Sequence, residues 1–220
     1  AGDYNGDGSS DVIVGAYGHN TDQGRAYLYL GSASVNNISD LTFTGLAVGN
    51  YFGYSVSNAG DVNGDGYEDL IVGAQRSNTD EGEAYIYFGG SILNNNIDLT
   101  FSGVTQYDFF GKSVSDAGDL NGDGYDDVII GAYGYSGSEN RGRAYVYYGG
   151  QSMNVTADLT ITGISNNEYL GYSVSSAGDV NGDDYDDFII GSYGYANSSG
   201  QAAIYFGGSI PNSTPDITIA

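Results

Sequence analysis

A nine-residue acidic phrase that occurs four times is the feature of this chain that most limits its fold. The phrase has the form Asp-x-Asn-Gly-Asp-x-x-x-Asp, and its copies begin at residues 3, 61, 119 and 179. The copies are therefore 58, 58 and 60 residues apart, and the sequence between them repeats as well. A constant period of this kind is typical of proteins whose units pack on their neighbours along the chain. The sequence therefore predicts a row of similar units.

Each unit contains four short segments that are typical of β-strands. In the second unit these are a Ser-Val-Ser segment, an apolar run after the acidic phrase, an alternating tyrosine segment and a final short segment, at residues 55–61, 70–72, 84–88 and 98–101. None is long enough for a helix, and none shows a sustained helical period. Four-stranded units at a fixed period are typical of β-propeller blades. We therefore predict an all-β fold of propeller blades, built from short antiparallel strands.

The unit boundaries are expected at approximately residues 1–45, 46–103, 104–163 and 164–220. The opening Ala1-Gly2-Asp3 aligns with Ala59-Gly60-Asp61, so the first unit lacks its first strand. A missing strand leaves unpaired backbone groups on its neighbour, and soluble proteins avoid such edges. We therefore expect the segment to be part of a larger propeller or repeat array. Two alternatives stay open: several copies that cover each other's edges, or a compact ring of four blades.

The four acidic phrases carry oxygen-bearing side chains at phrase positions 1, 3, 5 and 9. Ca²⁺ prefers about six to eight oxygen ligands, and glycine permits the sharp turn that gathers them in a short loop. The phrase is not an EF-hand loop, because Val72 stands where that motif has its glutamate. An acidic turn that binds nothing is the alternative for a single copy, but four copies in phase favour metal sites. We therefore predict four structural Ca²⁺ sites.

Each predicted site has four side-chain ligands and one backbone carbonyl. The expected side-chain ligands are Asp3, Asn5, Asp7 and Asp11; Asp61, Asn63, Asp65 and Asp69; Asp119, Asn121, Asp123 and Asp127; and Asp179, Asn181, Asp183 and Asp187. The expected carbonyl ligands belong to Ser9, Tyr67, Tyr125 and Tyr185. The fourth loop differs, because Asp184 replaces a glycine and adds a charge.

The charge and composition of the chain exclude several classes of function. The formal net charge is −23, with 28 acidic residues against five Lys and Arg, which disfavours nucleic acid and anionic lipid as partners. The chain has no cysteine, so disulfides, thiolate catalysis and cysteine-ligated zinc are excluded. No stretch approaches the length of a membrane-spanning helix, so direct membrane insertion is not expected.

Several recurring motifs together carry a family resemblance. Phe52-Gly53 and Phe110-Gly111, with Gly73-Ala74 and Gly131-Ala132, flank the acidic loops. In this order they resemble the FG-GAP repeats of integrin α-subunit β-propellers, and the resemblance covers essentially the whole chain. It implies four-stranded blades with Ca²⁺ held between the first and second strands, in propellers of seven blades. The chain departs from the pattern at Leu170, which replaces Phe before Gly171, and where Tyr or Gln follows Gly-Ala in place of Pro.

The expected function is non-catalytic: a calcium-stabilised extracellular module for adhesion, surface structure or assembly. We expect no catalytic residue, because His19 is the sole histidine and most acids belong to the loops. One alternative is a propeller that binds carbohydrate or peptide through the variable connections 17–24, 75–82, 133–142 and 193–200. Another is an accessory module of a secreted enzyme. The alternating tyrosines and the residues Phe52, Phe110 and Leu170 are expected to pack between blades rather than bind ligands.

The expected location is extracellular or at the cell surface, because cytosolic Ca²⁺ is too dilute to fill sites of this kind. The partners are then surface proteins, carbohydrates or other copies of the chain. Asn37, Asn154 and Asn197 begin Asn-x-Ser/Thr sequences in variable connections and are candidate N-glycan sites. A fourth such sequence, at Asn212, is weaker because Pro215 follows it.

Overall fold

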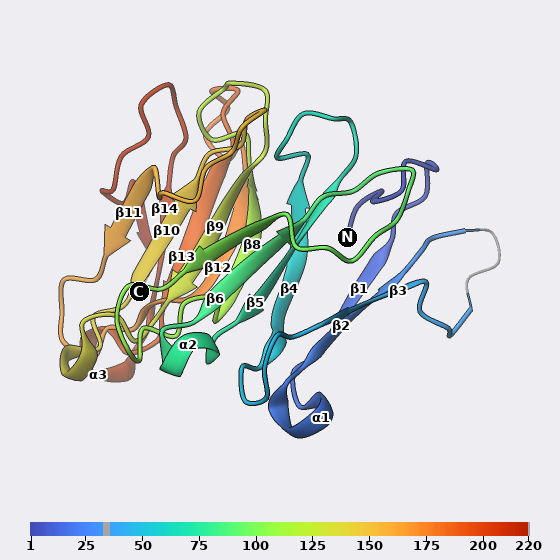
Figure 1. The fold of residues 1–220 in the computed structure, drawn as a ribbon. Helices are drawn as coiled ribbons and strands as arrows, with labels where there is room; N and C mark the ends of the chain where they lie inside the picture. Colours follow the sequence, from blue (N-terminus) through green and yellow to red (C-terminus); the bar gives the residue numbers. More distant parts are fainter. Residues whose placement is uncertain (33–35, 220) are drawn as a thin grey trace.

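A computed structural model describes residues 1–32 and 36–219 of the chain. The chain forms four antiparallel sheets that stand side by side in sequence order (Figure 1). The first sheet has three strands and the others have four. The strands are β1 (Val12–Ala16), β2 (Arg25–Tyr29) and β3 (Leu41–Thr44); β4 (Phe52–Gly60), β5 (Asp69–Ala74), β6 (Glu83–Tyr87) and β7 (Leu99–Ser102); β8 (Ser113–Gly118), β9 (Asp127–Ala132), β10 (Arg143–Tyr147) and β11 (Leu159–Thr162); and β12 (Leu170–Gly178), β13 (Asp187–Ser192), β14 (Gln201–Tyr205) and β15 (Ile217–Ile219).

The predicted all-β fold of propeller blades is confirmed, including the first blade that lacks its first strand. Single helical turns interrupt the connections between the second and third strands, where the sequence shows no helical period. They are α1 (His19–Asp22), α2 (Ser77–Asp80), η1 (Gly137–Glu139) and α3 (Tyr195–Ser198). Each of the four contains at least one residue with positive φ, such as Asn20 in α1 and Asn78 in α2, so they are tight turns rather than extended helices.

Apolar side chains occupy both faces of the middle sheets, because each sheet is covered by a neighbour on either side. In the second sheet Val72 and Tyr85 lie on one face, and Ile71 and Ile86 lie on the other. All four are at most 1% exposed. Three apolar clusters therefore fill the three interfaces between consecutive sheets. This arrangement confirms that alternate tyrosines pack between blades.

The Phe-Gly segment at the start of each first strand lies against the preceding blade. Phe52 and Phe110 are at most 1% exposed, and Leu170 is 5% exposed, as expected for core residues. Each forms an isolated parallel bridge to a glycine of the preceding blade, and these glycines are Gly24, Gly82 and Gly142. The Oγ atoms of Ser55 and Ser113 donate to the carbonyls of Gly111 and Gly171 in the next blade, over 2.8 and 3.0 Å. Consecutive blades are therefore joined by backbone as well as side-chain contacts.

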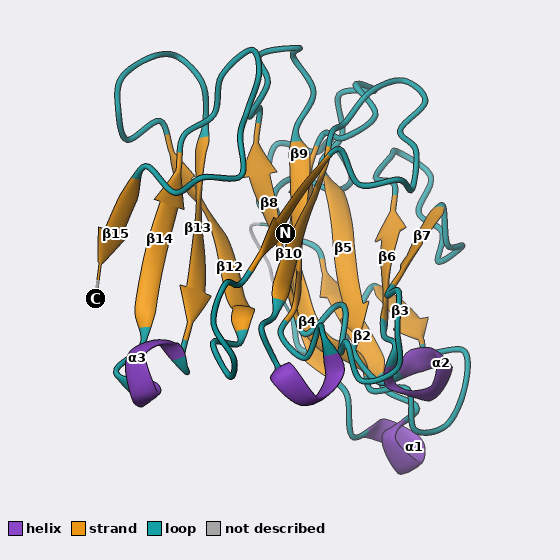
Figure 2. Cartoon of the chain, turned by 90° about the vertical axis from the view of Figure 1, so that its left-hand side faces the viewer, coloured by secondary structure: helices purple, strands orange, loops and turns teal. Residues whose placement is uncertain are grey.

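The outer faces of the first and last sheets are not covered by another sheet (Figure 2). Val12 and Val14 of the first sheet are 56% and 45% exposed, and Ile217 and Ile219 of the last are 42% and 55% exposed. Across residues 1–32 and 36–219, β15 pairs only with β14, and no strand pairing links the fourth sheet to the first. The pairing that a closed ring of four would need is therefore not seen among these residues; Ala220 lies outside them.

Candidate metal centre

The acidic loops lie at one end of the blades and the helical turns lie at the other. Residues 61–68 connect β4 to β5, and the turn α2 lies between β5 and β6. Because successive strands are antiparallel, these two kinds of connection fall at opposite ends of each sheet. The loops therefore sit between the first and second strands, where the family resemblance places them.

Within each loop, the side chains at positions 1, 3 and 5 are drawn together by backbone N–H groups. In the second loop the Asp65 N–H donates to Asp61 Oδ1 over 3.0 Å and to Asn63 Oδ1 over 2.8 Å. Asn63 Nδ2 also donates to Asp65 Oδ2 over 3.1 Å. The N–H of Gly66, which has a φ of +88°, donates to Asp61 Oδ2. The glycine at position 6 therefore provides the left-handed turn that closes the loop.

The aspartate at position 9 anchors the base of its loop through two backbone hydrogen bonds. Asp69 Oδ2 accepts from the N–H of Val62 over 3.0 Å, and Oδ1 accepts from the N–H of Gly89 over 2.8 Å. Asp11, Asp127 and Asp187 make the same pair of bonds in their own blades. All four aspartates are at most 3% exposed. Position 9 therefore ties the loop to the end of the third strand.

Burial makes the closing carboxylates of the second and third loops unfavourable as bare anions. It raises the pKa of Asp69 to about 7 and that of Asp127 to about 8, although their backbone hydrogen bonds act in the opposite direction. The neighbouring carboxylates at positions 1 and 5 raise both pKa values further. A cation held between these groups would remove that penalty, because it favours the ionised form.

Residues 1–32 and 36–219 contain no group of three His, Cys, Asp or Glu side chains close enough to form a ready metal site. Positions 1, 3 and 5 are brought together in each loop, whereas position 9 is held at the loop base. The donor set still fits Ca²⁺, since every candidate ligand is a hard oxygen. Each carboxylate oxygen offers two lone-pair positions, and Oδ2 of the position 1 aspartate accepts one N–H bond in each loop, which leaves a position for a cation.

Loop positions 7 and 8 connect each loop to its neighbour, a role that was not predicted from the sequence, where position 7 was expected only as a carbonyl ligand. At position 8, Asp126 Oδ2 accepts from the N–H of Asp61 in the preceding loop over 2.8 Å, and Asp186 does the same for Asp119 over 3.0 Å. At position 7, the ring of Tyr125 lies so close to Gly64 of the preceding loop that no Cβ would fit there. The acidic loops are therefore linked from blade to blade.

Asp116 on β8 is a half-buried acid close in sequence to these linked loops. Burial raises its pKa to about 6, and the carboxylates of Asp126, Glu68 and Asp186 add to the shift. Its equivalent in the second blade is Asn58, which donates a hydrogen bond to Glu68 over 2.6 Å. The third blade therefore has the carboxylate of Asp116 at the position where the second blade has the hydrogen-bond-donating amide of Asn58.

Asp116→Asn is expected to stabilise the fold by about 1–2 kcal/mol at pH 7.5. The folded-state pKa lies above the unfolded value, so ionisation of Asp116 costs stability fully above pH 6 and not below about pH 3.8. The gain of the variant should therefore shrink as the pH falls through this window. Urea unfolding of both proteins at pH 4 and pH 7.5 measures it, and an equal gain at both pH values would contradict the electrostatic cause.

The opposite end of the blades carries a strip of aromatic side chains, which we call the tyrosine strip. Its rings form two groups, one from the first and second blades and one from the third and fourth. Within each group, contacting rings have centroids 4.6–5.5 Å apart. Lys112 Nζ joins the two groups, because it lies 4.3 Å from the centroid of the Tyr54 ring and 4.5 Å from that of Tyr172. The strip consists of Tyr17, Tyr51, Tyr54, Phe109, Tyr133, Tyr169, Tyr172 and Tyr193, with Lys112.

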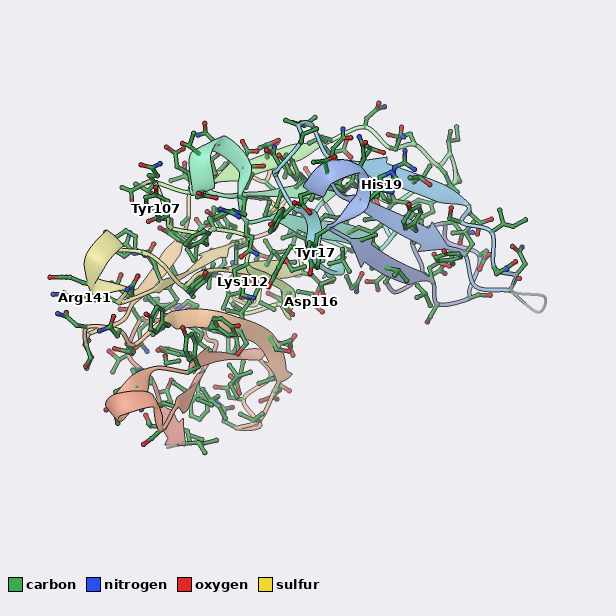
Figure 3. The ribbon with its side chains drawn as sticks, turned by 90° about the horizontal axis from the view of Figure 1, so that it is seen from below. Tyr17, His19, Tyr107, Lys112, Asp116 and Arg141 are labelled. Carbon is green, nitrogen blue, oxygen red and sulfur yellow. The ribbon has the colours of Figure 1, made fainter. Side chains whose placement is uncertain are left out.

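The tyrosine strip is partly open to solvent. Tyr17, Tyr172 and Tyr193 are 46%, 41% and 47% exposed, and Figure 3 shows Tyr17 and Lys112 on the end that carries the helical turns. The strip includes the first residues of three of the variable connections. Tyr54, Lys112 and Tyr172 were not predicted to be functional residues; the available signal was that each directly follows a Phe-Gly or Leu-Gly pair.

The pattern of the FG-GAP repeat matches this chain in four places, at residues 1–29, 52–87, 113–147 and 170–205. The chain belongs to the FG-GAP repeat family. Each match begins at or within the first strand of a blade, or at the acidic loop in the first blade, and ends at the close of the third strand. The family resemblance seen in the sequence is therefore confirmed, and the blades described above are FG-GAP blades.

Curated relatives of this FG-GAP chain are integrin α subunits. It is 31% identical to integrin alpha-8 of Mus musculus and 31% identical to integrin alpha-PS2 of Drosophila melanogaster, in each case over 93% of this chain. It is 36% identical to integrin alpha-4 of Xenopus laevis over 60% of this chain. The chain covers only 20%, 15% and 14% of the lengths of these relatives. No helix among the described residues is long and apolar enough to cross a membrane.

Proposed function

We propose that this chain is a calcium-stabilised, extracellular propeller module that acts without catalysis in adhesion, surface structure or assembly. The observation that carries the proposal is the set of four acidic loops in phase at one end of an FG-GAP array. Family membership and the integrin α relatives support an adhesion-related role. His19 lies in the turn α1, and most buried acids anchor loops or turns, which supports a non-catalytic role.

The adhesion role is testable with beads coated with the chain and passed over immobilised extracellular-matrix proteins, polysaccharides or the chain itself. We expect retention on at least one surface in about 1 mM Ca²⁺ and release when the ion is chelated, since loss of Ca²⁺ loosens the blades. Beads coated with a heat-unfolded sample are the control. Equal retention of folded and unfolded samples on every surface would refute the proposal.

The extracellular location is supported by the exposure of two of the candidate glycan sites. Asn37 and Asn154 are exposed and lie outside the strands. The side chain of Asn197 lies outside those that the structure describes. Secretion from a eukaryotic host should add glycan mass at Asn37 or Asn154, measurable by mass spectrometry before and after deglycosylation. A secreted product without any glycan would remove this line of support.

We also propose that further blades of a larger propeller cover the exposed outer faces of the first and fourth sheets. Val14 and Ile217 are exposed there, whereas residues at equivalent positions on the middle sheets are packed between blades. Light scattering and binding of a hydrophobic dye test this on residues 1–220. A dye-binding monomer is the expected result, stable oligomers would favour coverage by other copies, and a monomer that binds no dye would contradict uncovered faces.

A second candidate function is recognition of carbohydrate or peptide by the tyrosine strip. Exposed aromatic rings stack on sugar faces and peptide side chains at little entropic cost. Tyr17→Ala and Tyr193→Ala should each weaken binding on a glycan or peptide array by about tenfold, the effect of about 1.4 kcal/mol. Ile92→Ala is the matched control, because Ile92 is 85% exposed and lies outside the strip. Loss of binding in the control alone would exclude the strip.

A further inference from the structure

The interface between the third and fourth blades contains a cavity. The residues at this place differ in type from those at the equivalent positions of the other two interfaces. The volume of the cavity is about 320 Å³. Its apolar wall includes Ile161 of β11, Leu170 of β12, and Ala203 and Tyr205 of β14. The cavity therefore lies between two blades. Figure 2 shows the strands β12 and β14 and the turn α3, each of which contributes residues to its lining.

The cavity occupies a position where the preceding interfaces hold a tyrosine. Ala203 pairs with Ile190 in the fourth sheet. The equivalent pairs are Tyr85 with Val72 in the second sheet and Tyr145 with Ile130 in the third. Tyr85 and Tyr145 are 1% and 5% exposed, so their rings are part of the core. Ala203 removes the entire phenol group from the same place.

A second replacement enlarges the space. In the first two interfaces the tyrosine ring packs on the phenylalanine that begins the first strand, with centroids 5.7 Å apart for Phe52 and Tyr85 and 5.3 Å apart for Phe110 and Tyr145. Leu170 stands in the place of that phenylalanine in the fourth blade. The third interface therefore lacks both rings of an aromatic pair.

One side of the cavity is polar. Glu168, Ser192 and Gln201 line it, and Glu168 is 3% exposed. Glu168 Oε2 accepts from the N–H groups of Ile164 and Ser165, both over 2.8 Å, which fixes the carboxylate in the wall. In the second blade the Tyr85 hydroxyl donates to Glu83, and Gln201 is the residue at that position in the fourth blade.

We propose that this cavity binds a neutral phenolic group, with the ring against Leu170 and Ala203 and the hydroxyl toward Glu168 and Gln201. The volume lies in the range of small-molecule sites, which are mostly apolar with a few convergent polar groups. The carboxylate in the wall accepts from a hydroxyl donor and repels anions, so a neutral phenol is selected over a phenolate or a carboxylic acid. The phenol comes either from a free small molecule or from a tyrosine side chain of a peptide.

The experiment is a titration of residues 1–220 with p-cresol, followed by ligand-observed NMR and by the melting temperature. We expect saturable binding with a dissociation constant of about 1 mM or tighter, as befits a ligand of eight heavy atoms. Ala203→Tyr supplies the missing ring and should abolish binding. Ala203→Ser is the matched control, because it changes the same residue but leaves the cavity open and should keep binding.

A gain of binding tests the origin of the site independently. Phe110→Leu combined with Tyr145→Ala copies both replacements into the preceding interface and should raise the stoichiometry from one p-cresol to two. N-acetyl-tyrosinamide distinguishes the sources: its binding assigns a tyrosine of a peptide, and binding of p-cresol alone assigns a free phenol. Absence of saturable p-cresol binding, or undiminished binding by folded Ala203→Tyr, would overturn the proposal.

Discussion

Chelation of Ca²⁺ from the folded chain is expected to lower its free energy of unfolding by about 2–6 kcal/mol in total. Four sites with dissociation constants of about 10⁻⁴–10⁻³ M would each contribute about 0.4–1.4 kcal/mol at roughly 1 mM Ca²⁺. The physical reason lies in the buried closing carboxylates, such as Asp69 and Asp127, which repel the other acids of their loops when no cation is present. Urea unfolding in Ca²⁺ and in EGTA measures the difference.

A variant of a single loop separates the sites from one another. Asp123→Asn removes one ligand charge and should reduce the number of bound Ca²⁺ ions, measured by calorimetry, from four to three. Asp158→Asn is the control in the same blade, because Asp158 accepts from the Tyr148 N–H and lies outside the acidic loops. A melting temperature that is the same in Ca²⁺ and in EGTA would show that Ca²⁺ bound to the loops does not stabilise the fold.

The architecture of the blades followed from local sequence because each strand carries its pattern within a few residues. The alternation of Ala84 to Phe88 and the run at Leu70 to Val72 predicted neighbouring strands, which the structure confirms. The single helical turns were missed, since a turn of four residues has no period to detect. Residues such as Asn78 adopt positive φ there, which the residue type permits but does not require.

The acidic loops were located from sequence because their pattern of oxygen-bearing side chains is contained in nine residues. The links between loops were not, because Asp126 and Asp61 are 65 residues apart and meet only when two blades stack. The same reason hid the contact of Lys112 with Tyr54 and Tyr172. The cavity beside Ala203 also needed the strand register, which shows that an unremarkable alanine replaces a buried tyrosine.

The second strand of each blade ends with a glycine followed by alanine, or by serine in the fourth blade, and substitution of this glycine is expected to have the second large effect. A Cβ on Gly131 would lie 2.0 Å from the carbonyl oxygen of Gly171 in the next blade, and one on Gly73 would lie 2.1 Å from that of Gly111. Real Cβ atoms do not approach backbone so closely, and a carbonyl cannot rotate away as a side chain can. These glycines therefore set how closely two blades approach.

Gly131→Ala is expected to destabilise the chain by about 3 kcal/mol, near the upper end for overpacking in a core. The added methyl group must separate the third and fourth blades or distort the first strand of the fourth. Urea unfolding at constant Ca²⁺ measures the loss, and the backbone amides of the apolar cluster that fills this interface should exchange hydrogen faster.

Gly191→Ala in the fourth blade is the matched control. Its Cβ would meet only the Ser173 side chain at close range, with the Oγ atom 2.3 Å away, because no following blade packs on it in this segment. A serine hydroxyl can rotate, so this variant should cost about 1 kcal/mol or less. Equal losses of stability for Gly131→Ala and Gly191→Ala would show that the local conformation of the strand, rather than contact between blades, requires glycine at this position. A large difference would make blade spacing the reason that the Gly-Ala pair recurs.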